Sequence, residues 1–328
     1  MNVEELKTKN QDDLFYFVGS DAVASEKIIA PRYSYWKSVF RVFFRKKINI
    51  VLLALLALIL IVSFVMPIFW KYDTFEYNLD TAARNLSPSA AMEYFKERDG
   101  ENYNPIKWIL GSGPYSNSIM YGIISSAKTS LLLAIICAAI NMVVGIVVGA
   151  VWGYSKKFDS VMLVIYNIVA NVPYILLISV LVYVIGSGFG SFVFALTVTG
   201  WLGIAYFFRT QVMVIRDREY SLASRCLGTP IFRMVGKNIL PFLTSVIVTL
   251  LATELPSYIS MEVYLSYLGV GLSAETPSLG RMISEAQNSF LSFPWAFWSP
   301  VAIASAVTII LYVLGQNLAD ASDPRTHM

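Results

Sequence analysis

The sequence is poor in the residues that most enzyme active sites and metal centres require. Its 328 residues include one histidine, His327, next to the last position, and two cysteines, Cys137 and Cys226. Catalytic triads and multi-histidine metal sites need an imidazole that the fold holds in place, which a chain end does not provide. Two cysteines are too few for a disulfide framework or a zinc finger. We therefore expect no catalytic residue and no metal site.

Charged residues are also scarce. They make up 14% of the chain, against roughly 25% in soluble domains, whereas hydrophobic residues make up 56%. The mean hydropathy is +0.59 and the formal net charge is +3. This composition excludes a disordered, collagenous or nucleic-acid-wrapping chain and indicates that much of the apolar surface faces lipid.

Six apolar runs are long enough to span a membrane. A helix needs roughly 20 apolar residues to cross a hydrocarbon core of about 30 Å. We expect spans at 48–70, 129–152 (within a helical run over 119–154), 161–185, 191–208, 239–268 and 298–318. The first run is too long for a signal-peptide core, so it is expected to be retained. The predicted fold class is an all-α polytopic membrane protein with six transmembrane helices.

Lysine and arginine residues alternate with the spans and predict the orientation. They cluster before the first span, at Lys156 and Lys157 after the second, and between residues 209 and 237 after the fourth. Because basic loops stay in the cytoplasm, both termini are predicted to be cytoplasmic. The acidic-leaning segment 71–118 is then extracytoplasmic.

The chain outside the first span divides into a predicted arm, core and tail. Residues 1–47 form a cytoplasmic arm, whose basic and aromatic second half, 31–47, suits a helix lying against anionic lipid. We prefer lipid to nucleic acid as its partner because the segment adjoins a span. Residues 119–320 form the membrane core, and residues 321–328 form a cytoplasmic tail.

Small residues recur in the second span. Gly145, Gly149 and Gly153 follow Asn141 at four-residue spacing, which places them on one helix face. Small residues let another helix approach closely, and packing is a main attraction between helices in lipid. The face can serve a moving partner helix or static packing within the chain, and the sequence leaves both interpretations open.

Polar residues in two other spans are candidates for an aqueous path. Asn167 and Asn171 precede Pro173, which opens the helical hydrogen-bond ladder, beside a path or as a structural kink. Glu254 lies in the fifth span, where a charged side chain costs roughly 2.5–3.5 kcal/mol on insertion scales. Glu262 is expected to lie near the outer end of that span, in contact with water.

One segment imitates a nucleotide-binding motif. Residues 122–130, GIISSAKTS, approximate Gly-x4-Gly-Lys-Thr/Ser, but Ala127 replaces the second glycine. The motif needs a preceding strand and a glycine-rich turn whose N–H groups hold phosphates, whereas an apolar helical run begins here. If a nucleotide drives the protein, we expect another chain to bind it.

The loop between the fourth and fifth spans is the most informative segment. Its sequence over 209–241, RTQVMVIRDREYSLASRCLGTPIFRMVGKNILP, predicts two short helices. The first, over about 217–226, ends near Gly228, a good helix terminator, and Pro230 opens the second. Such a helix-turn-helix can dock in a partner's groove or serve as a solvated connector.

The same loop resembles the cytoplasmic signature loop of ABC-importer permeases. That signature reads Glu-Ala-Ala, three residues, Gly, nine residues, Ile-x-Leu-Pro. The spacing matches throughout in Leu222-Ala223-Ser224, Gly228, Asn238 and Leu240-Pro241. Leu222 and Asn238 depart from the usual Glu and Ile.

Two further stretches narrow the resemblance. Residues 266–283, SYLGVGLSAETPSLGRMI, and 314–325, LGQNLADASDPR, resemble the second, C-type permease of oligopeptide systems within the peptide/nickel type. Residues 111–120, GSGPYSNSIM, depart from the Gly-Thr-Asp…Gly-Arg-Asp stretch that such permeases often carry. The resemblance implies the type I ABC-importer permease fold, in the plasma membrane of a prokaryote, and a transport subunit rather than an enzyme.

By this resemblance, residues 209–238 form the coupling loop, and its helix, 217–228, docks in a cytoplasmic ATPase. The implied coupling residues are Asp217, Glu219, Tyr220, Leu222, Ala223, Ser224, Arg225, Gly228, Leu240 and Pro241. The polar contact of the usual glutamate is not expected at Leu222.

The resemblance also implies partners and cargo. The partners are a homologous second permease, two ATPase subunits that carry ATP and Mg, an extracytoplasmic peptide-binding protein and membrane lipid, with no nucleic acid and no cofactor on this chain. Oligopeptides are the implied cargo, with dipeptides or nickel as alternatives. A secondary carrier, a channel or an intramembrane enzyme is disfavoured, because charges inside the spans are sparse and no inverted repeat is visible.

Overall fold

The computed structural model describes residues 34–70, 72 and 80–323. The predictions for residues 1–33 of the arm, for His327 and for Arg325 therefore lie outside the described residues. The chain divides after Ser38 into two units, and the second unit contains the membrane helices. A helix, α2 (Tyr35–Arg45), occupies part of the predicted basic and aromatic segment.

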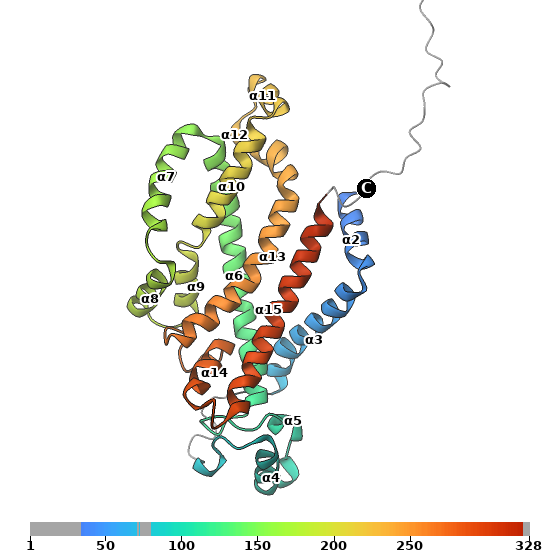
Figure 1. The fold of residues 1–328 in the computed structure, drawn as a ribbon, viewed down its shortest axis with the longest axis vertical. Helices are drawn as coiled ribbons and strands as arrows, with labels where there is room; N and C mark the ends of the chain where they lie inside the picture. The colour runs from blue at the N-terminus through green and yellow to red at the C-terminus, as the bar shows by residue number, and fades with distance from the viewer. Residues whose placement is uncertain (1–33, 71, 73–79, 324–328) are drawn as a thin grey trace, which may run out of the picture. The chain divides into compact units, whose positions relative to one another are not determined.

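Helices that are long and apolar enough to cross a membrane make up most of the second unit (Figure 1). Five segments pass this test singly, and α7 with α8, bent by 79° at their junction, bring the number to six when the pair is counted as one span. The spans are α3 (Lys47–Phe69), α6 (Ile119–Tyr154), α7 (Lys156–Ala170) with α8 (Tyr174–Ile185), α9 (Phe189–Thr197) with α10 (Trp201–Arg216), α13 (Thr244–Tyr267) and α15 (Pro294–Ser322). This architecture confirms the predicted all-α polytopic fold class.

The side chains of α3 show that lipid is the solvent of this fold. The buried residues of α3 are Asn49 and Ser63, whereas Leu58 and Ile61 are 60% and 59% exposed. Water would drive the opposite distribution, with the apolar side chains inside. In lipid, the polar groups must find partners inside the protein while leucine and isoleucine face the hydrocarbon.

The connections between spans collect at two ends of the bundle. At one end, Lys46 donates a hydrogen bond to Asn317 (2.7 Å), and Asn317 donates one to Asn49 (2.8 Å), so α15 ends where α3 begins. Figure 1 shows α11 (Glu219–Cys226) and α12 (Ile231–Arg233) at this end, and α4 (Pro88–Asp99) and α5 (Pro105–Trp108) at the opposite end.

The glycine face of α6 packs against α10. A Cβ atom at Gly145 would lie 2.6 Å from a methyl group of Ile204, and one at Gly149 would lie 2.5 Å from the carbonyl oxygen of Ala205. At Gly153 the neighbour is the carbonyl oxygen of Arg209, at 2.6 Å. The backbones of α6 and α10 are therefore in close contact. The helix that packs on the glycine face belongs to this same chain.

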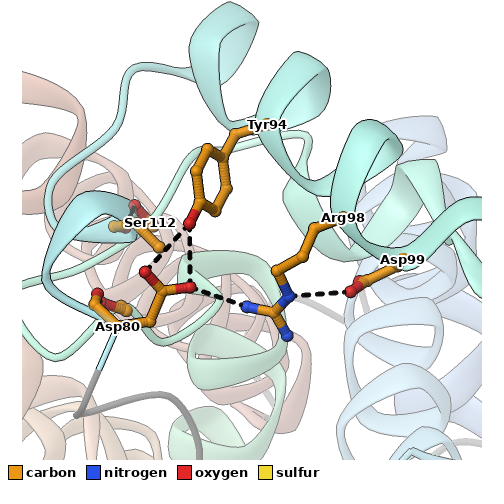
Figure 2. Close-up of polar contacts among 7 residues, drawn as sticks. Asp80, Tyr94, Arg98, Asp99 and Ser112 are labelled. Carbon is orange, nitrogen blue, oxygen red and sulfur yellow. Dashed lines mark hydrogen bonds and ion pairs between the residues drawn. The ribbon is translucent and has the colours of Figure 1, made fainter.

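The segment between α3 and α6 has a small core of its own. Besides α4 and α5, this segment contains two 3-10 turns, η2 (Thr81–Ala83) and η3 (Gly100–Asn102). The rings of Phe95 and Trp108 stack with their centroids 3.4 Å apart. Figure 2 shows the polar side of this cluster, where Tyr94 donates a hydrogen bond to Asp80 (3.0 Å) and Arg98 pairs with the same carboxylate (3.0 Å). These contacts give the end opposite α11 an ordered polar surface.

Another short helix, α14 (Leu279–Ala286), packs against α13, α6 and α15 at the end opposite α11 (Figure 1). The side chain of Ser278 starts it by accepting a hydrogen bond from the N–H of Arg281 (3.1 Å), as an N-cap residue does. This helix brings its first residues to the end of α13, where they meet Glu262.

Candidate functional site

The loop between α10 and α13 folds as a short helix-turn-helix, as its sequence indicates. α10 ends at Arg216, α11 begins at Glu219 and ends at Cys226, and Pro230 precedes α12. Gly228 has a φ of +76°, a left-handed conformation that costs glycine little. The chain turns sharply there and returns to the membrane.

Arg216 fixes the first side of this loop to the end of α6. Its side chain is 8% exposed and donates a hydrogen bond to the carbonyl oxygen of Gly153 (2.9 Å). Its Nε and Nη2 atoms bind the two carboxylate oxygens of Asp217, at 2.9 and 3.1 Å. This guanidinium holds the pKa of the Asp217 carboxyl below its usual range. Arg225 adds a second link, with its guanidinium carbon 5.9 Å from the centre of the Tyr154 ring.

The other side of the loop is tied to α11 by two contacts. Asn238 donates a hydrogen bond to the Ser224 hydroxyl (3.0 Å), so the asparagine that departs from the family pattern joins two parts of the loop. The rings of Tyr220 and Phe242 lie 5.3 Å apart. A π-helical turn (Met234–Ile239) and a 3-10 turn (Leu240–Leu243) that includes Pro241 then lead into α13.

The remaining side chains of the loop form an apolar tip. Leu222 is 44% exposed, Leu227 87% and Phe232 80%. Glu219, Ala223 and Arg225 are exposed around them, while Ser224 is half-buried. Leu222, which stands where the family has glutamate, thus adds apolar surface to a protruding helix. Such a tip can insert into a cleft of a partner protein.

A groove lies where the start of α8 and the break between α9 and α10 meet α13. Its volume is about 310 Å³, and its lining is Tyr174, Thr199, Gly200, Gly203, Glu254, Ser257, Tyr258 and Met261. An adjacent groove of about 290 Å³ shares Tyr174, Thr199 and Gly203 with it and reaches the α7–α8 junction at Val172 and Pro173. Glu254 therefore lines a mainly apolar depression to which Tyr174, Thr199, Ser257 and Tyr258 add hydroxyl groups.

The two asparagines predicted to line a path do not line either of these grooves, and their place on a path stays a prediction. Asn167 and Asn171 are both exposed, and Asn171 donates a hydrogen bond to the backbone carbonyl of Asn167 (2.5 Å). Neither residue lines the two grooves. The predicted break at Pro173 is present as the bend between α7 and α8. Of the three path candidates, Glu254 lines one of these two grooves, and its place on a path stays a prediction.

The expectation that Glu262 is simply in contact with water is wrong. Its side chain is 0% exposed. The carboxylate accepts hydrogen bonds from Ser130 of α6 (3.0 Å), Ser266 (3.1 Å), Ser278 (2.7 Å) and the N–H of Gly280 (3.3 Å). The reason is that α14 covers the end of α13 and places its N-terminal residues, which favour an anion, against this carboxylate. We call these five residues the outer clamp.

Sequence reasoning missed most of the clamp and the role of Arg216. Ser130 is the last residue of the segment that approximates a nucleotide-binding motif. Sequence reasoning considered it only as part of that motif and did not predict its hydrogen bond to Glu262. Ser278 and Gly280 lie within the stretch 266–283, whose resemblance to oligopeptide permeases marked it without assigning a role. For Arg216, the signal was an arginine at the end of a span followed directly by an aspartate.

An arginine–aspartate pair at the same end was also not foreseen. Arg209 of α10 binds both carboxylate oxygens of Asp159 of α7, at 2.9 Å for Nη2, and the indole N–H of Trp152 donates to the same carboxylate (2.7 Å). The arginine also lies over the ring of Tyr206, 5.7 Å from its centre. This cluster joins α6, α7 and α10 near the coupling loop. Among the described residues, no group of three or more His, Cys, Asp or Glu side chains could hold a metal ion.

A bundle of helices that are long and apolar enough to cross a membrane, with a protruding helical loop at one end, defines a class, the multi-pass membrane protein. Residues 141–328 match the family described as "Binding-protein-dependent transport system inner membrane component". Residues 34–88 match the "N-terminal TM domain of oligopeptide transport permease C".

Individual relatives agree with these matches over nearly the whole chain. The oligopeptide transport system permease protein AmiD of Streptococcus pneumoniae is 44% identical over 315 residues, which are 95% of this chain and 97% of the relative. The dipeptide transport system permease protein DppC of Bacillus subtilis is 30% identical over 305 residues, 92% of this chain and 89% of the relative. The oligopeptide permease OppC of Bacillus subtilis is 28% identical over 315 residues, 95% of this chain and 97% of the relative.

The chain belongs to the family of binding-protein-dependent transport system inner membrane components. The resemblance to oligopeptide permeases of the C type is thereby confirmed. The protein is a multi-pass membrane permease and a transport component.

Proposed function

We propose that this chain is one permease subunit of an ATP-driven importer of oligopeptides and forms half of its translocation path. The observation that carries this proposal is the 44% identity, over 95% of the chain, to a permease named for oligopeptide transport. The dipeptide permease of Bacillus subtilis, at 30% identity, makes dipeptides the second candidate cargo.

The proposed assembly has three kinds of protein partner. A homologous permease completes the path, two cytoplasmic ATPases bind ATP and Mg, and an extracytoplasmic binding protein delivers the peptide. The end that carries α11 is assigned to the cytoplasm, together with both termini, because Lys46, Lys156, Lys157 and Arg218 stand there and basic residues remain inside. The ordered polar surface of α4 and α5 then faces the binding protein.

The coupling loop is the proposed contact with an ATPase. α11 presents Leu222 and Leu227 to the partner, and its base is bonded to two transmembrane helices. Arg216 connects it to the last turn of α6 through Gly153, and Asn238 connects Ser224 to the segment that begins α13. A displacement of α11 by a closing ATPase dimer is thereby transmitted to α6 and α13. Hydrolysis itself takes place on the partner chains.

The test is co-purification and uptake with a matched pair of variants. Leu222→Arg places a charge on the tip of α11, and Ile106→Arg makes the same change at a residue that is 48% exposed at the opposite end. We expect Leu222→Arg to lose the ATPase subunits and ATP-dependent peptide uptake in proteoliposomes, and Ile106→Arg to retain the ATPase subunits. Deletion of residues 217–228 should have the same result as Leu222→Arg. Retained ATPase binding and uptake after that deletion would contradict the proposal.

Cargo is tested with alanine peptides of two to six residues in the same proteoliposomes. Uptake that is highest for four or more residues supports an oligopeptide permease. Uptake confined to dialanine would assign the chain to dipeptides instead.

A further inference from the structure

Glu254 is a carboxylate near the middle of a transmembrane helix. It lies ten residues after Thr244 and thirteen before Tyr267, the ends of α13, which is roughly 15 and 20 Å along the helix axis. Among the described residues, no lysine or arginine side chain acts on the Glu254 carboxyl group. A charged side chain at this depth is costly unless it faces a partner or a water-filled cavity.

Tyr258 is hydrogen-bonded to Glu254, whereas the hydroxyls of Ser257 and Tyr174 in the same groove keep their lone pairs open. Asn141 donates a hydrogen bond to the hydroxyl of Tyr258 (2.5 Å), which directs the proton of that hydroxyl towards Glu254, with which it is hydrogen-bonded. The hydroxyl protons of Ser257 and Tyr174 are used by backbone carbonyls, at 2.7 and 3.0 Å. Their oxygen lone pairs therefore remain for a donor that enters the groove.

Two buried oxygens at the groove await a donor. Within the part of the chain that the structure describes, the hydroxyl of Thr199 and the Oδ1 atom of Asn141 have no hydrogen-bond partner. Asn141 is 0% exposed and lies directly behind Gly200, where a Cβ atom would come within 2.5 Å of its Nδ2 atom. Unpaired buried acceptors are unusual in a folded protein. Here Thr199 lines the same groove as the carboxylate, and Asn141 lies behind Gly200 of that lining.

The backbone around the groove is also irregular. Its lining comes from the start of α8 at Tyr174, from the break between α9 and α10 at Thr199 and Gly200, and from the turn of α13 that contains Pro256. Interrupted helices at membrane depth are tolerated where they line a cavity, and transporters use them to form sites near the middle of the bilayer. The groove therefore has the backbone of a binding site as well as its polar groups.

We propose that this groove binds the ammonium group at the amino end of the transported peptide, with Glu254 as its counter-ion and the hydroxyls of Ser257 and Thr199 as further acceptors. This inference rests on the proposed function. Peptides of different sequence share only their backbone and their two charged ends, so a path that accepts many sequences needs contacts of that kind. An ammonium group has three N–H donors and no acceptor, which matches a lining of acceptors around one carboxylate.

The test compares a peptide that has this ammonium group with one that lacks it. Complexes are purified through a tag on this chain and reconstituted with the binding protein, and uptake of radiolabelled penta-alanine and N-acetyl-penta-alanine is measured at concentrations that saturate the binding protein with each. The variants are Glu254→Gln, Glu254→Asp and, as the control, Glu275→Gln, which removes the same charge from an exposed position in the outer loop.

Glu254→Gln should lower the uptake of penta-alanine about tenfold, as loss of a charged hydrogen-bond partner does, and should leave uptake of the acetylated peptide unchanged. Glu254→Asp should restore part of the preference for penta-alanine over the acetylated peptide. Glu275→Gln should take up both peptides as the wild type does. Because only this chain varies, any preference of the binding protein cancels in the comparison.

Three results would overturn the inference. The first is an equal fall in the uptake of both peptides by the Glu254→Gln complex. The second is unchanged uptake of both. The third is loss of the second permease subunit from the purified Glu254→Gln complex, which would make Glu254 a subunit contact. Failure of the wild-type complex to take up either peptide would overturn the proposed function itself and this inference with it.

Discussion

Glu254 and Glu262 lie eight residues apart on α13, and their surroundings differ in every respect. Glu262 is fully buried and accepts four hydrogen bonds from three helical segments. Glu254 is half-buried, borders a groove and is hydrogen-bonded to one side chain, Tyr258. A carboxylate whose bonding capacity is filled by its own chain holds the fold together. One whose capacity is left open is available to another molecule.

The comparison is tested most severely by Glu262→Ala. This change leaves the hydroxyls of Ser130, Ser266 and Ser278 and the N–H of Gly280 without their acceptor. We expect the free energy of unfolding to fall by about 3 kcal/mol or more, since each unsatisfied buried group costs roughly 1–3 kcal/mol. Thermal unfolding of the detergent-solubilised complex measures the effect. An unchanged Tm would mean that the clamp does not stabilise the protein.

The second prediction concerns the close approach of α14 to α13. A Cβ atom at Gly280 would lie 2.6 Å from the carboxylate of Glu262 and 2.8 Å from the Cα of Val263. Gly280→Ala should therefore cost about 1–3 kcal/mol, as overpacking does. The matched control is Gly190→Ala on α9, where no atom lies within 4 Å of the new Cβ. Equal Tm values for the two variants would contradict the tight fit of the clamp.

A third carboxylate, Asp217, sharpens the comparison because it is paired with a cation in water. Arg216 lowers its pKa in the folded protein, so the pair stabilises the fold above the unfolded pKa of about 3.9 and loses this effect as the pH falls through the lowered value. Asp217→Asn should lower the Tm by less than Gly280→Ala, because the aspartate is exposed and screened. The difference from the wild type should be constant from pH 6 to 8 and vanish at pH values below both pKa values. A difference that persists in acid would point to a contact other than this ion pair.

The smallest effect on stability is expected for Glu254→Gln. Its carboxylate has few bonds within the chain, so the Tm should stay within the range of ordinary surface substitutions, about 0.5 kcal/mol. Comparing its Tm with that of Glu262→Gln distinguishes a residue that lines the groove from one that stabilises the fold. A loss as large as that of the Glu262 variant would remove the distinction between the two sites.

Much of the fold could be predicted from the sequence because lipid imposes a length and a polarity on each span. The apolar run 48–70 and helix α3 (Lys47–Phe69) differ by one residue at each end. The turn at Gly228 and the break at Pro173 followed from local backbone chemistry. These features depend on neighbouring residues, which the sequence displays directly.

The clamp and the groove could not be predicted in the same way, because they depend on contacts between distant segments. Glu262 meets Ser130, which is 132 residues away in sequence, and nothing in the hydropathy of α13 reports that α14 folds back over it. Asn141 and Tyr258, 117 residues apart, likewise form a pair that only the packing of α6 against α13 creates. The family resemblance marked the right segments, and the structure assigned their contacts.

Helix α6 is bonded both to the coupling loop and to the outer clamp. Gly153, near one end of α6, accepts a hydrogen bond from Arg216, and Ser130 donates one to Glu262. Gly153 follows Ser130 by 23 positions, which is roughly 35 Å of uninterrupted helix. A continuous helix resists axial compression because every turn is closed by its own hydrogen bonds. An axial displacement of α6 at the coupling loop would therefore reach the outer clamp with little loss, because the helix between them is continuous.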